Sequence, residues 1–570
     1  MNVSVALLKF AESLGLDTAF CLTGGMAMHL NRALYESKGL KTVFVHHETA
    51  AVVAAEGYSK SWELSRPGLA VITSGPAVTN CLTGLASAFG DSTPLLVIAG
   101  QVKSSDINRI NVRTHGIQEV DQLGLVSHVT KYAARVTAEN IRVVLAEAYN
   151  SLTSGRLGPV FLEVPLDEQS RECDLGSFRP TGEVSTKGLT EPLRHLEAFR
   201  RPVVLIGNGV RRESSKVRSL IPVLSERRIP RLYTWQSFDL EPAANEGNQG
   251  CPGMFAPIHA NRVLCSADLV VSIGARLDLA TTAYSPGSFG SQAKRIIVDI
   301  DELELAKLQS DDGTTLIAAD GGSFLQALID GNLEGSEEWY QFCSETKQSA
   351  LTEEQERLDS DQLTVREVSR IASRHSKRRV IVPASSGLAE ETLTRFFEPE
   401  HQTLFFNGAS LGSMGMGLAH GIGAAAGDPR DGVWIFEGDG GLLMNVQELS
   451  TLSLNFPTGV ALFLLNNQGY ASISASQGRT FGYEFGASRE TGVAFPDWEL
   501  LVTSFGLPYQ RIESKSSFEN VLQDWRPSSR TCFYDLYVPG QEPRGPQLTT
   551  SLTNGVLQTQ ALGELAWHAV

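Results

Sequence analysis

The sequence has no long hydrophobic run, and no stretch approaches the roughly 18–20 apolar residues that a membrane-spanning helix needs. Residues 1–10 lack a basic leader and a small-residue cleavage site, so they predict the start of a helix and not a signal peptide. Basic residues are in the minority, with 48 Lys and Arg against 64 Asp and Glu and a net charge of −16. Because nucleic acids and anionic membranes are bound through clustered positive charge, both are disfavoured as partners, whereas a local basic pocket for a small phosphate is not.

Cysteine is also scarce. The seven cysteines stand singly and form no Cys-x-x-Cys pair, which disfavours a zinc motif and indicates reduced core thiols in a cytoplasmic protein. Short repeats, heptad runs and low-complexity tracts are absent. What remains is ordinary globular composition, 42% hydrophobic and 20% charged, over 570 residues, a length that requires several hydrophobic cores.

Short apolar runs alternate with helical patterns along the chain, which is typical of parallel α/β sheets. Polar stretches at 167–192 and 335–361 divide the runs into three sets. The predicted strands are 42–45, 69–73, 95–99 and 160–164, then 202–207, 267–274 and 295–301, then 380–383, 432–437, 460–466 and 532–538.

We therefore predict three doubly wound α/β domains with parallel sheets. They span residues 1–170, 190–335 and 360–540. A tail at 541–570 follows, and the sequence assigns it no role.

The most informative motif lies in the third domain. One predicted strand runs into Gly438-Asp439-Gly440-Gly441, and the next runs into Asn466-Asn467-Gln468-Gly469. Asp439 and Asn467 stand 28 positions apart, which fits one strand–helix–strand crossover, so both should lie at the carboxyl ends of neighbouring strands, where open sheets bind ligands. Asn445 and Glu448 have capping-box spacing and predict the start of the intervening helix.

Oxygen ligands suit Mg²⁺, and glycine turns let backbone N–H groups approach a diphosphate. The alternative is a tight glycine turn with a capping asparagine.

These two segments resemble the signature of thiamine diphosphate enzymes, and residues 444–451 resemble the acetolactate synthase branch. The resemblance implies that Asp439, the Asn467 side chain and the Gly469 carbonyl bind Mg²⁺. It implies a pyrimidine-binding first domain, a central Rossmann-like domain and a diphosphate-binding third domain. Gly438, Gly440 and Gly441 are then cofactor-binding residues as well.

The first domain supplies the acid that this chemistry requires. Thiamine diphosphate reacts only when its thiazolium C2 loses a proton, and a carboxylate at N1′ of the pyrimidine promotes that loss. The segment around Glu48 resembles the family segment that carries this carboxylate; the alternative is a charge that stabilises a helix N-terminus. Glu56 is interpreted as structural. Gln118 matches an active-site glutamine of the family and is the second catalytic candidate; the alternative is a polar loop residue.

Further cofactor contacts follow from the resemblance. Gly24 and Gly25 form a loop before a helix, and Asn80 ends a strand-to-helix turn at 73–80. Residues 407–415 resemble the loop that bends the cofactor, with Met414 between its rings and the Gly412 carbonyl accepting from its amino group. The alternative for Met414 is core filling.

In this family one subunit supplies the acid and another the diphosphate site. The resemblance therefore implies a homodimer or homotetramer.

The central domain is similar to the part of acetolactate synthases that holds FAD. The alternative is that these turns are purely structural, as in relatives without flavin. The candidate flavin-binding residues are Gly207, Gly209, Gly274, Arg276, Asp278 and Asp299.

Three departures from acetolactate synthases concern the acceptor. Ser476 stands where those enzymes carry a tryptophan in the acceptor pocket, 279–280 is Leu-Ala in place of Asp and Arg, and 103–105 is Lys-Ser-Ser in place of Pro-Arg-Arg. These changes open volume and remove carboxylate clamps. Residues 470–477 and 116–121 look closer to the branch that transfers an acetyl unit to a keto-sugar, whose known member makes yersiniose.

We therefore predict a carboligase that decarboxylates pyruvate, or a similar 2-keto acid, and transfers the acyl unit to a ketone or keto-sugar. Acetolactate synthesis and plain decarboxylation share every motif above. A non-catalytic cofactor-binding protein is the alternative of another class, and the intact Glu48 speaks against it.

Overall fold

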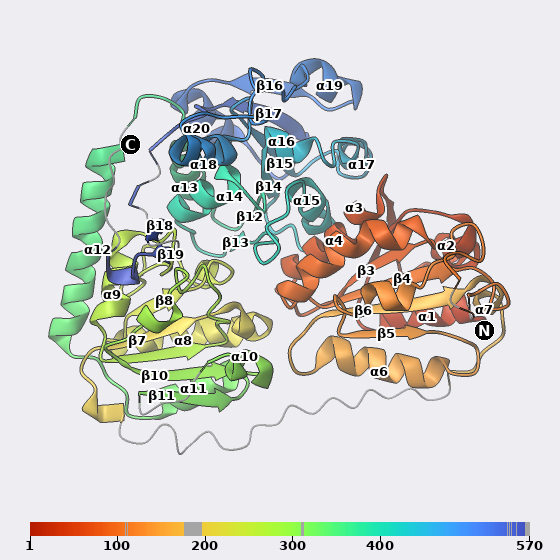
Figure 1. Ribbon diagram of the computed structural model, residues 1–570, viewed down its shortest axis with the longest axis horizontal. Coiled ribbons are helices and arrows are strands. Elements are labelled where there is room, and N and C mark those ends of the chain that lie inside the picture. The colour runs from red at the N-terminus through yellow and green to blue at the C-terminus, as the bar shows by residue number, and fades with distance from the viewer. Residues whose placement is uncertain are drawn as a thin grey trace.

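The computed structural model describes residues 1–108, 110, 112–175, 196–308, 313–358, 360–543, 545–546, 548, 550–553 and 556–564. Three α/β domains follow one another along the chain, each built on a parallel sheet (Figure 1). The predicted fold class is confirmed. The polar stretch predicted at 167–192 falls mainly on residues 176–195, which lie outside the described residues.

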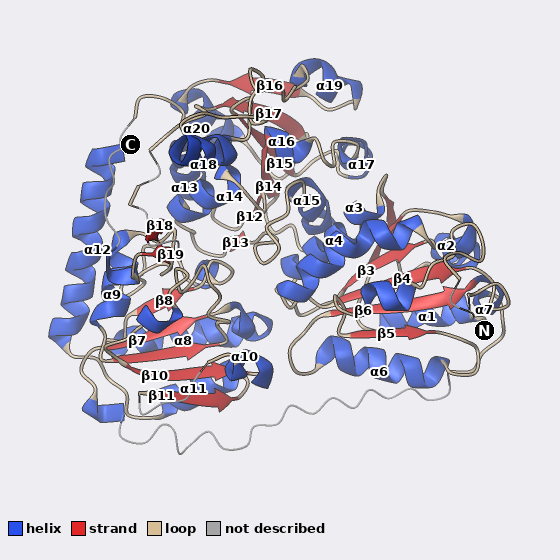
Figure 2. Cartoon of the chain, viewed as in Figure 1, coloured by secondary structure: helices blue, strands red, loops and turns tan. Residues whose placement is uncertain are grey.

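The first domain has a six-stranded sheet of order β2-β1-β3-β4-β6-β5, with helices on both faces (Figure 2). All four predicted strands are present, and the structure adds β1 and β5, which no apolar run predicted. The elements are α1 (Val3–Ser13), β1 (Thr18–Cys21), α2 (Met28–Glu36), β2 (Lys41–Phe44), α3 (Glu48–Ser61), β3 (Gly68–Ile72), α4 (Pro76–Gly90), β4 (Leu95–Gln101), α5 (Gln122–Val126), β5 (Tyr132–Arg135), α6 (Ile141–Thr153), β6 (Pro159–Pro165) and α7 (Leu166–Gln169).

The central domain has a five-stranded parallel sheet of order β11-β10-β9-β7-β8. Helix α12 occupies most of the polar stretch predicted at 335–361. The stretch is polar because this helix is exposed along most of its length and carries only a few apolar residues. The elements are β7 (Pro202–Ile206), α8 (Ser214–Glu226), β8 (Arg231–Tyr233), α9 (Ile258–Ser266), β9 (Leu269–Ile273), β10 (Lys294–Asp299), α10 (Glu302–Ala306), β11 (Thr314–Ala318), α11 (Gly321–Asp330) and α12 (Glu337–Leu358).

The third domain has a six-stranded parallel sheet of order β13-β12-β14-β15-β17-β16, and the described part of the tail forms the antiparallel hairpin β18–β19. Its elements are α13 (Val365–Arg374), β12 (Val380–Pro383), α14 (Leu388–Phe396), β13 (Leu404–Phe405), α15 (Gly417–Ala426), β14 (Val433–Gly438), α16 (Asp439–Leu442), α17 (Glu448–Asn455), β15 (Val460–Asn466), α18 (Ala471–Phe481), α19 (Trp498–Ser504), β16 (Tyr509–Ile512), α20 (Lys515–Asp524), β17 (Cys532–Tyr537), β18 (Thr550–Thr553) and β19 (Val556–Thr559). Short 3₁₀ helices are η1 (Gly25–Ala27), η2 (Leu196–Ala198), η3 (Asn208–Glu213), η4 (Phe238–Leu240), η5 (Pro286–Ser288) and η6 (Leu562–Glu564).

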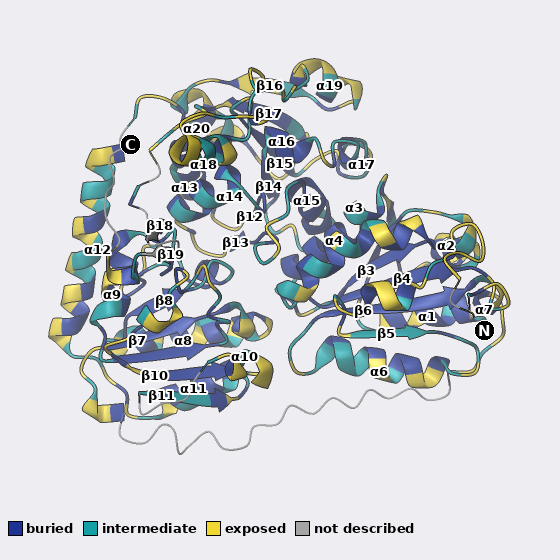
Figure 3. Cartoon of the chain, viewed as in Figure 1, coloured by how far each residue is buried: buried dark blue, intermediate teal, exposed yellow. Residues whose placement is uncertain are grey.

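The central strands of all three sheets are buried on both faces, as parallel sheets require (Figure 3). Exposed side chains gather on outer helices such as α12 and α18 (Figure 3). The seven cysteines are all unpaired. Within the described residues, no helix is both long and apolar enough to cross a membrane.

The capping box predicted at Asn445 and Glu448 is wrong. Helix α17 begins at Glu448 after Gln447, whose side chain makes no capping bond. Asn445 instead donates to the carbonyl of Gly415 at 2.6 Å, and Glu448 accepts from the backbone N–H of His46 at 3.0 Å. Both polar side chains are buried, and they bind segments that are distant along the chain. At an exposed helix end, they would instead have bonded to backbone groups of the same helix.

The first and third domains meet where α3 crosses α15, and small residues allow the close approach. A Cβ placed on Gly57 would lie 2.2 Å from the carbonyl oxygen of His420, and one on Gly423 would lie 1.9 Å from that of Ala54. The two helices therefore pack backbone against backbone at this crossing.

Gly57→Ala should destabilise the protein by about 1–3 kcal/mol, because the added methyl group overpacks a backbone contact that cannot yield. Gly478→Ala in α18 is the matched control: it meets open space, and alanine should stabilise that helix by up to about 1 kcal/mol. Urea unfolding midpoints measure both changes. Equal midpoints for the two variants would contradict the close crossing of α3 and α15.

Candidate active site

The oxygen ligands predicted for a metal lie together at the carboxyl ends of β14 and β15. These strands pair in parallel, with Gly438 beside Leu465, so the turns that follow them are neighbours. The backbone N–H of Gly469 donates to Oδ2 of Asp439 at 3.2 Å and to Oδ1 of Asn467 at 3.1 Å. Because both oxygens share one donor, they converge on the same small region.

Asp439 has the electrostatics of a group that needs a cation. Burial raises its pKa to about 7, although N–H groups that include those of Gly440 and Gly469 partly offset this. A bound divalent ion would favour the charged carboxylate. The Asp439 carboxylate, the Asn467 amide oxygen and the Gly469 carbonyl oxygen are the kinds of ligand that Mg²⁺ binds, so these residues fit the implied metal.

The glycines of the motif have two different roles. A Cβ on Gly440 would lie 2.0 Å from the Tyr470 ring, and one on Gly441 would lie 2.4 Å from Oε1 of Glu437. Packing therefore requires both. Gly438 has no atom within 4 Å of the same position, so that side of the turn is open to a ligand.

The loop at 407–415 is held at both ends. The N–H of Gly408 donates to Oγ of Ser385 at 2.9 Å, and Asn445 holds the Gly415 carbonyl. Gly412 is exposed and has φ of +63°, and Met414 is half-buried. Met416, only 1% exposed, fills the core here, which favours a ligand-facing Met414.

Glu48 is the first residue of α3 and is 9% exposed. Its Oε2 accepts from Nδ2 of Asn80 at 3.0 Å, and Thr49 fixes Asn80 by donating to its carbonyl oxygen at 2.5 Å. The structure thus joins the predicted acid and the predicted cofactor residue Asn80 at the starts of α3 and α4. A neutral amide, not a cation, is the side-chain partner of this carboxylate.

Gln118 and the glycine loop lie at the same end of the first sheet. The backbone of Gln118, at φ +63°, packs on Gly75, where a Cβ would lie 2.7 Å from the Gln118 carbonyl oxygen. A Cβ on Gly24 would overlap Thr73 at 2.4 Å, whereas Gly25 faces open space. Among the described residues, the buried hydroxyl of Thr73 has no hydrogen-bond partner, so it is available to a ligand. The Gln118 side chain itself is exposed.

The predicted acid lies in the first domain and the predicted metal ligands lie in the third. Among the residues that the structure describes, no hydrogen bond or ion pair joins Glu48 to Asp439 or Asn467. The predicted residues therefore form two sets, one in each domain, which we call half-sites.

The six predicted flavin residues gather at the carboxyl ends of β7, β9 and β10. The N–H of Gly209 donates to the Gly274 carbonyl at 2.9 Å, so the glycine turns pack on each other. Arg276 donates to the Gly90 carbonyl at 2.5 Å and to Ser410 Oγ at 3.0 Å, and it pairs with Asp278. Gly207 donates to Ile273, and burial raises the pKa of Asp299. These contacts are consistent with a bound nucleotide and equally with turns that have a purely structural role.

Ser476 lies on the exposed face of α18, beside Ile473. A cavity of about 540 Å³ lies elsewhere, between the central and third domains, and none of the predicted site residues lines it. Ser476 therefore faces the outside of this chain and not a closed pocket.

Two buried acids escape the sequence reasoning. Burial raises the pKa of Glu437 to about 7 and that of Glu390 to about 8. Glu437 carries a sequence signal, because it is an acid that ends the apolar run 433–436. Glu390 has none, since an acid in the first turn of a helix is ordinary. Its partner Asn407, which donates to it at 3.4 Å, is brought there by the fold.

Comparisons with known proteins identify relatives for all three domains. Three family descriptions match in order: the N-terminal thiamine pyrophosphate binding domain at 1–125, the central domain of thiamine pyrophosphate enzymes at 189–328, and their C-terminal binding domain at 385–536. Acetolactate synthase large subunits are similar, at 27% identity from Lactococcus lactis (91% of this chain, 90% of that one) and 29% from Corynebacterium glutamicum (99% and 91%). The chloroplastic acetolactate synthase of Arabidopsis thaliana is 27% identical over 98% of this chain and 85% of its own.

Asp439→Ala should weaken magnesium-dependent binding of thiamine diphosphate by at least about 10-fold, or 1.4 kcal/mol, because the bridging cation loses its charged ligand. Titration calorimetry with and without Mg²⁺ measures this. Asp524→Ala, an exposed acid on α20 of the same domain, is the control and should bind normally. Unchanged affinity in Asp439→Ala would remove this residue from the metal site.

Proposed function

Because the chain belongs to the thiamine pyrophosphate enzymes, we propose that it is a carboligase that decarboxylates pyruvate, or a similar 2-keto acid, and joins the acyl unit to a ketone or keto-sugar. The product is an acyloin. One observation carries the proposal: Asp439 and Asn467 converge on the Gly469 amide at the carboxyl ends of two parallel strands.

In this proposal Asp439, Asn467 and the Gly469 carbonyl hold Mg²⁺, which neutralises the cofactor diphosphate. The open side of Gly438 receives the phosphate oxygens, supported by the packed turn at Gly440 and Gly441. Bound thiamine diphosphate supplies the electron sink for cleaving and forming bonds beside a carbonyl.

The chain's own groups supply proton transfer and shape. Glu48 holds the proton at the pyrimidine N1′, and Asn80 orients its carboxylate. Gln118 reaches the reacting centre from the turn that it shares with Gly75. Met414 separates the two cofactor rings, and the Gly412 carbonyl accepts from the amino group. A half-buried Met414 beside a fully buried Met416 supports this assignment.

The acceptor assignment rests on what replaces the bulky and charged groups of acetolactate synthases. Ser476 and Ile473 leave an open face on α18, and Leu279 is 54% exposed. Ser104 is engaged by Asp167, at 2.8 Å from its backbone N–H. Apart from the exposed Lys103, the residues at these positions supply no cation for the carboxylate of a second 2-keto acid, which favours a larger, uncharged carbonyl acceptor.

We extend the proposal to FAD, bound at the glycine turns of the central domain without a part in electron transfer. The convergence of these turns at one sheet edge supports it. The visible absorbance of the purified protein decides between flavin and structural turns.

A homodimer or homotetramer supplies the second half of each site, and the unpaired cysteines fit a cytoplasmic location.

Product analysis tests the proposed function. The protein is incubated with thiamine diphosphate, Mg²⁺ and pyruvate, first alone and then with small and bulky ketones. We expect little acetolactate and a mixed acyloin with the bulky ketone. Acetolactate as the main product in every mixture would support the activity named for the relatives, and acetaldehyde alone would support plain decarboxylation.

Glu48→Gln should lower product formation by about 100-fold or more, the range that general acid–base groups contribute, because glutamine cannot hold the proton. Thiamine diphosphate affinity and the thermal midpoint should change little. Glu147→Gln, an exposed acid on α6, is the control and should be fully active. Near-normal turnover by folded Glu48→Gln would exclude Glu48 from proton transfer.

Ser476→Trp should lower the ratio of bulky-ketone product to acetolactate, because the indole fills acceptor space and differential binding sets specificity. Pyruvate consumption should be spared, since the donor is expected to react at the cofactor thiazolium and not in the acceptor channel. Ser219→Trp on α8, an exposed serine of the central domain, controls for a surface tryptophan. An unchanged ratio in active enzyme would place Ser476 outside the acceptor pocket.

A further inference from the structure

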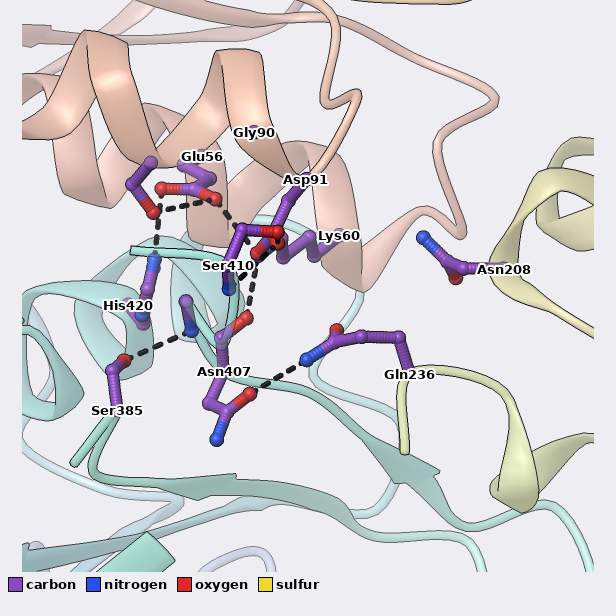
Figure 4. A network of polar contacts seen from close by, with 12 residues as sticks. Glu56, Lys60, Gly90, Asp91, Asn208, Gln236, Ser385, Asn407, Ser410 and His420 are labelled. Carbon is purple, nitrogen blue, oxygen red and sulfur yellow. Dashed lines mark hydrogen bonds and ion pairs between the residues drawn. The ribbon is translucent and has the colours of Figure 1, made fainter. Parts of the chain in front are cut away.

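A buried cluster of charges in the first domain contacts the backbone of the third. The ammonium of Lys60, whose side chain is 5% exposed, lies 2.7 Å from Glu56 and 2.6 Å from Asp91 (Figure 4). It also donates to the carbonyl oxygen of Asn407 at 2.5 Å. An ammonium has three N–H donors, so these partners satisfy it completely.

Asp91 extends the cluster along the same loop. While Oδ2 pairs with Lys60, Oδ1 accepts from the backbone N–H of Ser410 at 3.1 Å and also from its hydroxyl (Figure 4). Lys60 and Asp91 therefore hold a carbonyl and an N–H three residues apart. These two bonds fix both the position and the direction of the chain just before Gly412 and Met414.

The central domain reaches the same point. Nε2 of Gln236 donates to Oδ1 of Asn407 at 2.7 Å (Figure 4), while Nδ2 of Asn407 donates to the Ala384 carbonyl at 3.2 Å. Asn407 is thus contacted by all three domains. With Asn445 holding Gly415 from the other side, the segment 407–415 is restrained at both ends.

Electrostatics shows that the cluster is charged. Burial by itself lowers the pKa of Lys60, but Asp91 and Glu56 outweigh burial and raise it above its usual value. Buried ion pairs contribute little net stability compared with apolar packing, and their best-attested use is to specify one arrangement. Here the arrangement that they specify is the path of a loop.

We propose that Lys60 and Asp91 are positioning residues that hold segment 407–415 so that the Gly412 carbonyl and the Met414 side chain meet the cofactor. This inference rests on the proposed function, because it assigns a purpose to the loop named there. Neither residue touches the reacting atoms; both act through the backbone of Asn407 and Ser410.

Glu56 provides a matched control inside the same cluster. It is as buried as Asp91 and as close to Lys60, but its other partners are Ser87 at 3.2 Å and His420 at 3.1 Å, not the loop. A cluster that only latched the two domains together would make Glu56 and Asp91 equivalent. A cluster that positions the loop makes Asp91 different.

The experiment compares Asp91→Asn, Lys60→Met and Glu56→Gln in the full-length protein, with thermal midpoints recorded for each. Hydrogen exchange of residues 408–415 is measured without cofactor, thiamine diphosphate affinity by calorimetry, and turnover with pyruvate. We expect faster exchange confined to this segment, about 10-fold weaker cofactor binding and up to about 100-fold lower kcat for Asp91→Asn and Lys60→Met. Glu56→Gln should lower the thermal midpoint with far smaller changes in segment exchange and cofactor affinity.

Equal effects of Asp91→Asn and Glu56→Gln on segment exchange and cofactor affinity would overturn the proposal. If either variant fails to fold, Ser410→Ala removes the hydroxyl's bonds to Asp91 and Arg276 but keeps the bond from the Ser410 backbone N–H to Asp91. It should still speed exchange in the segment, whereas unchanged exchange would count against the clamp. Lys60→Arg should restore part of the affinity lost in Lys60→Met. Absence of cofactor binding or turnover in the unmodified protein would refute the proposed function, while the exchange comparison would still decide whether the loop is clamped.

Discussion

The parallel pairing of β14 with β15 is the constraint on which the site depends. Because both strands run in the same direction, the turns after them open at one edge of the sheet. Asp439 and Asn467 come from segments 28 residues apart, yet share the amide of Gly469. The same geometry recurs in the first domain, where the starts of α3 and α4 bring Glu48 to Asn80.

Buried charge is used in two ways in this protein. Asp439 and Glu437 are buried acids whose pKa is raised by desolvation, so they lack full compensation within the chain. Lys60 is also buried, but carboxylates and a carbonyl satisfy its three donors. An incompletely compensated charge is ready to receive a ligand, whereas a compensated cluster specifies structure.

The candidate site residues are divided between domains, so contacts between the domains set the geometry of the candidate site. Each domain holds its own half-site through local hydrogen bonds, and contacts such as Arg276 with Gly90 and Lys60 with Asn407 set how the domains sit together. Small residues at the crossing of α3 and α15 allow that fit. Ser476, by contrast, lies at an exposed position on α18.

The sequence alone determined the three parallel-sheet domains and the pairing of Asp439 with Asn467, because buried strands are continuous apolar runs and crossover length is local information. It missed the short strands β1, β5, β8, β11, β13, β16, β18 and β19, and it misread Asn445 and Glu448 as a helix cap. Only the tertiary structure showed that Asn445 binds Gly415, that Glu390 is buried beside Asn407, and that Lys60 reaches a loop 347 residues away. Propensity and spacing report on neighbours along the chain, whereas a hydrogen bond between domains depends on packing that no local pattern encodes.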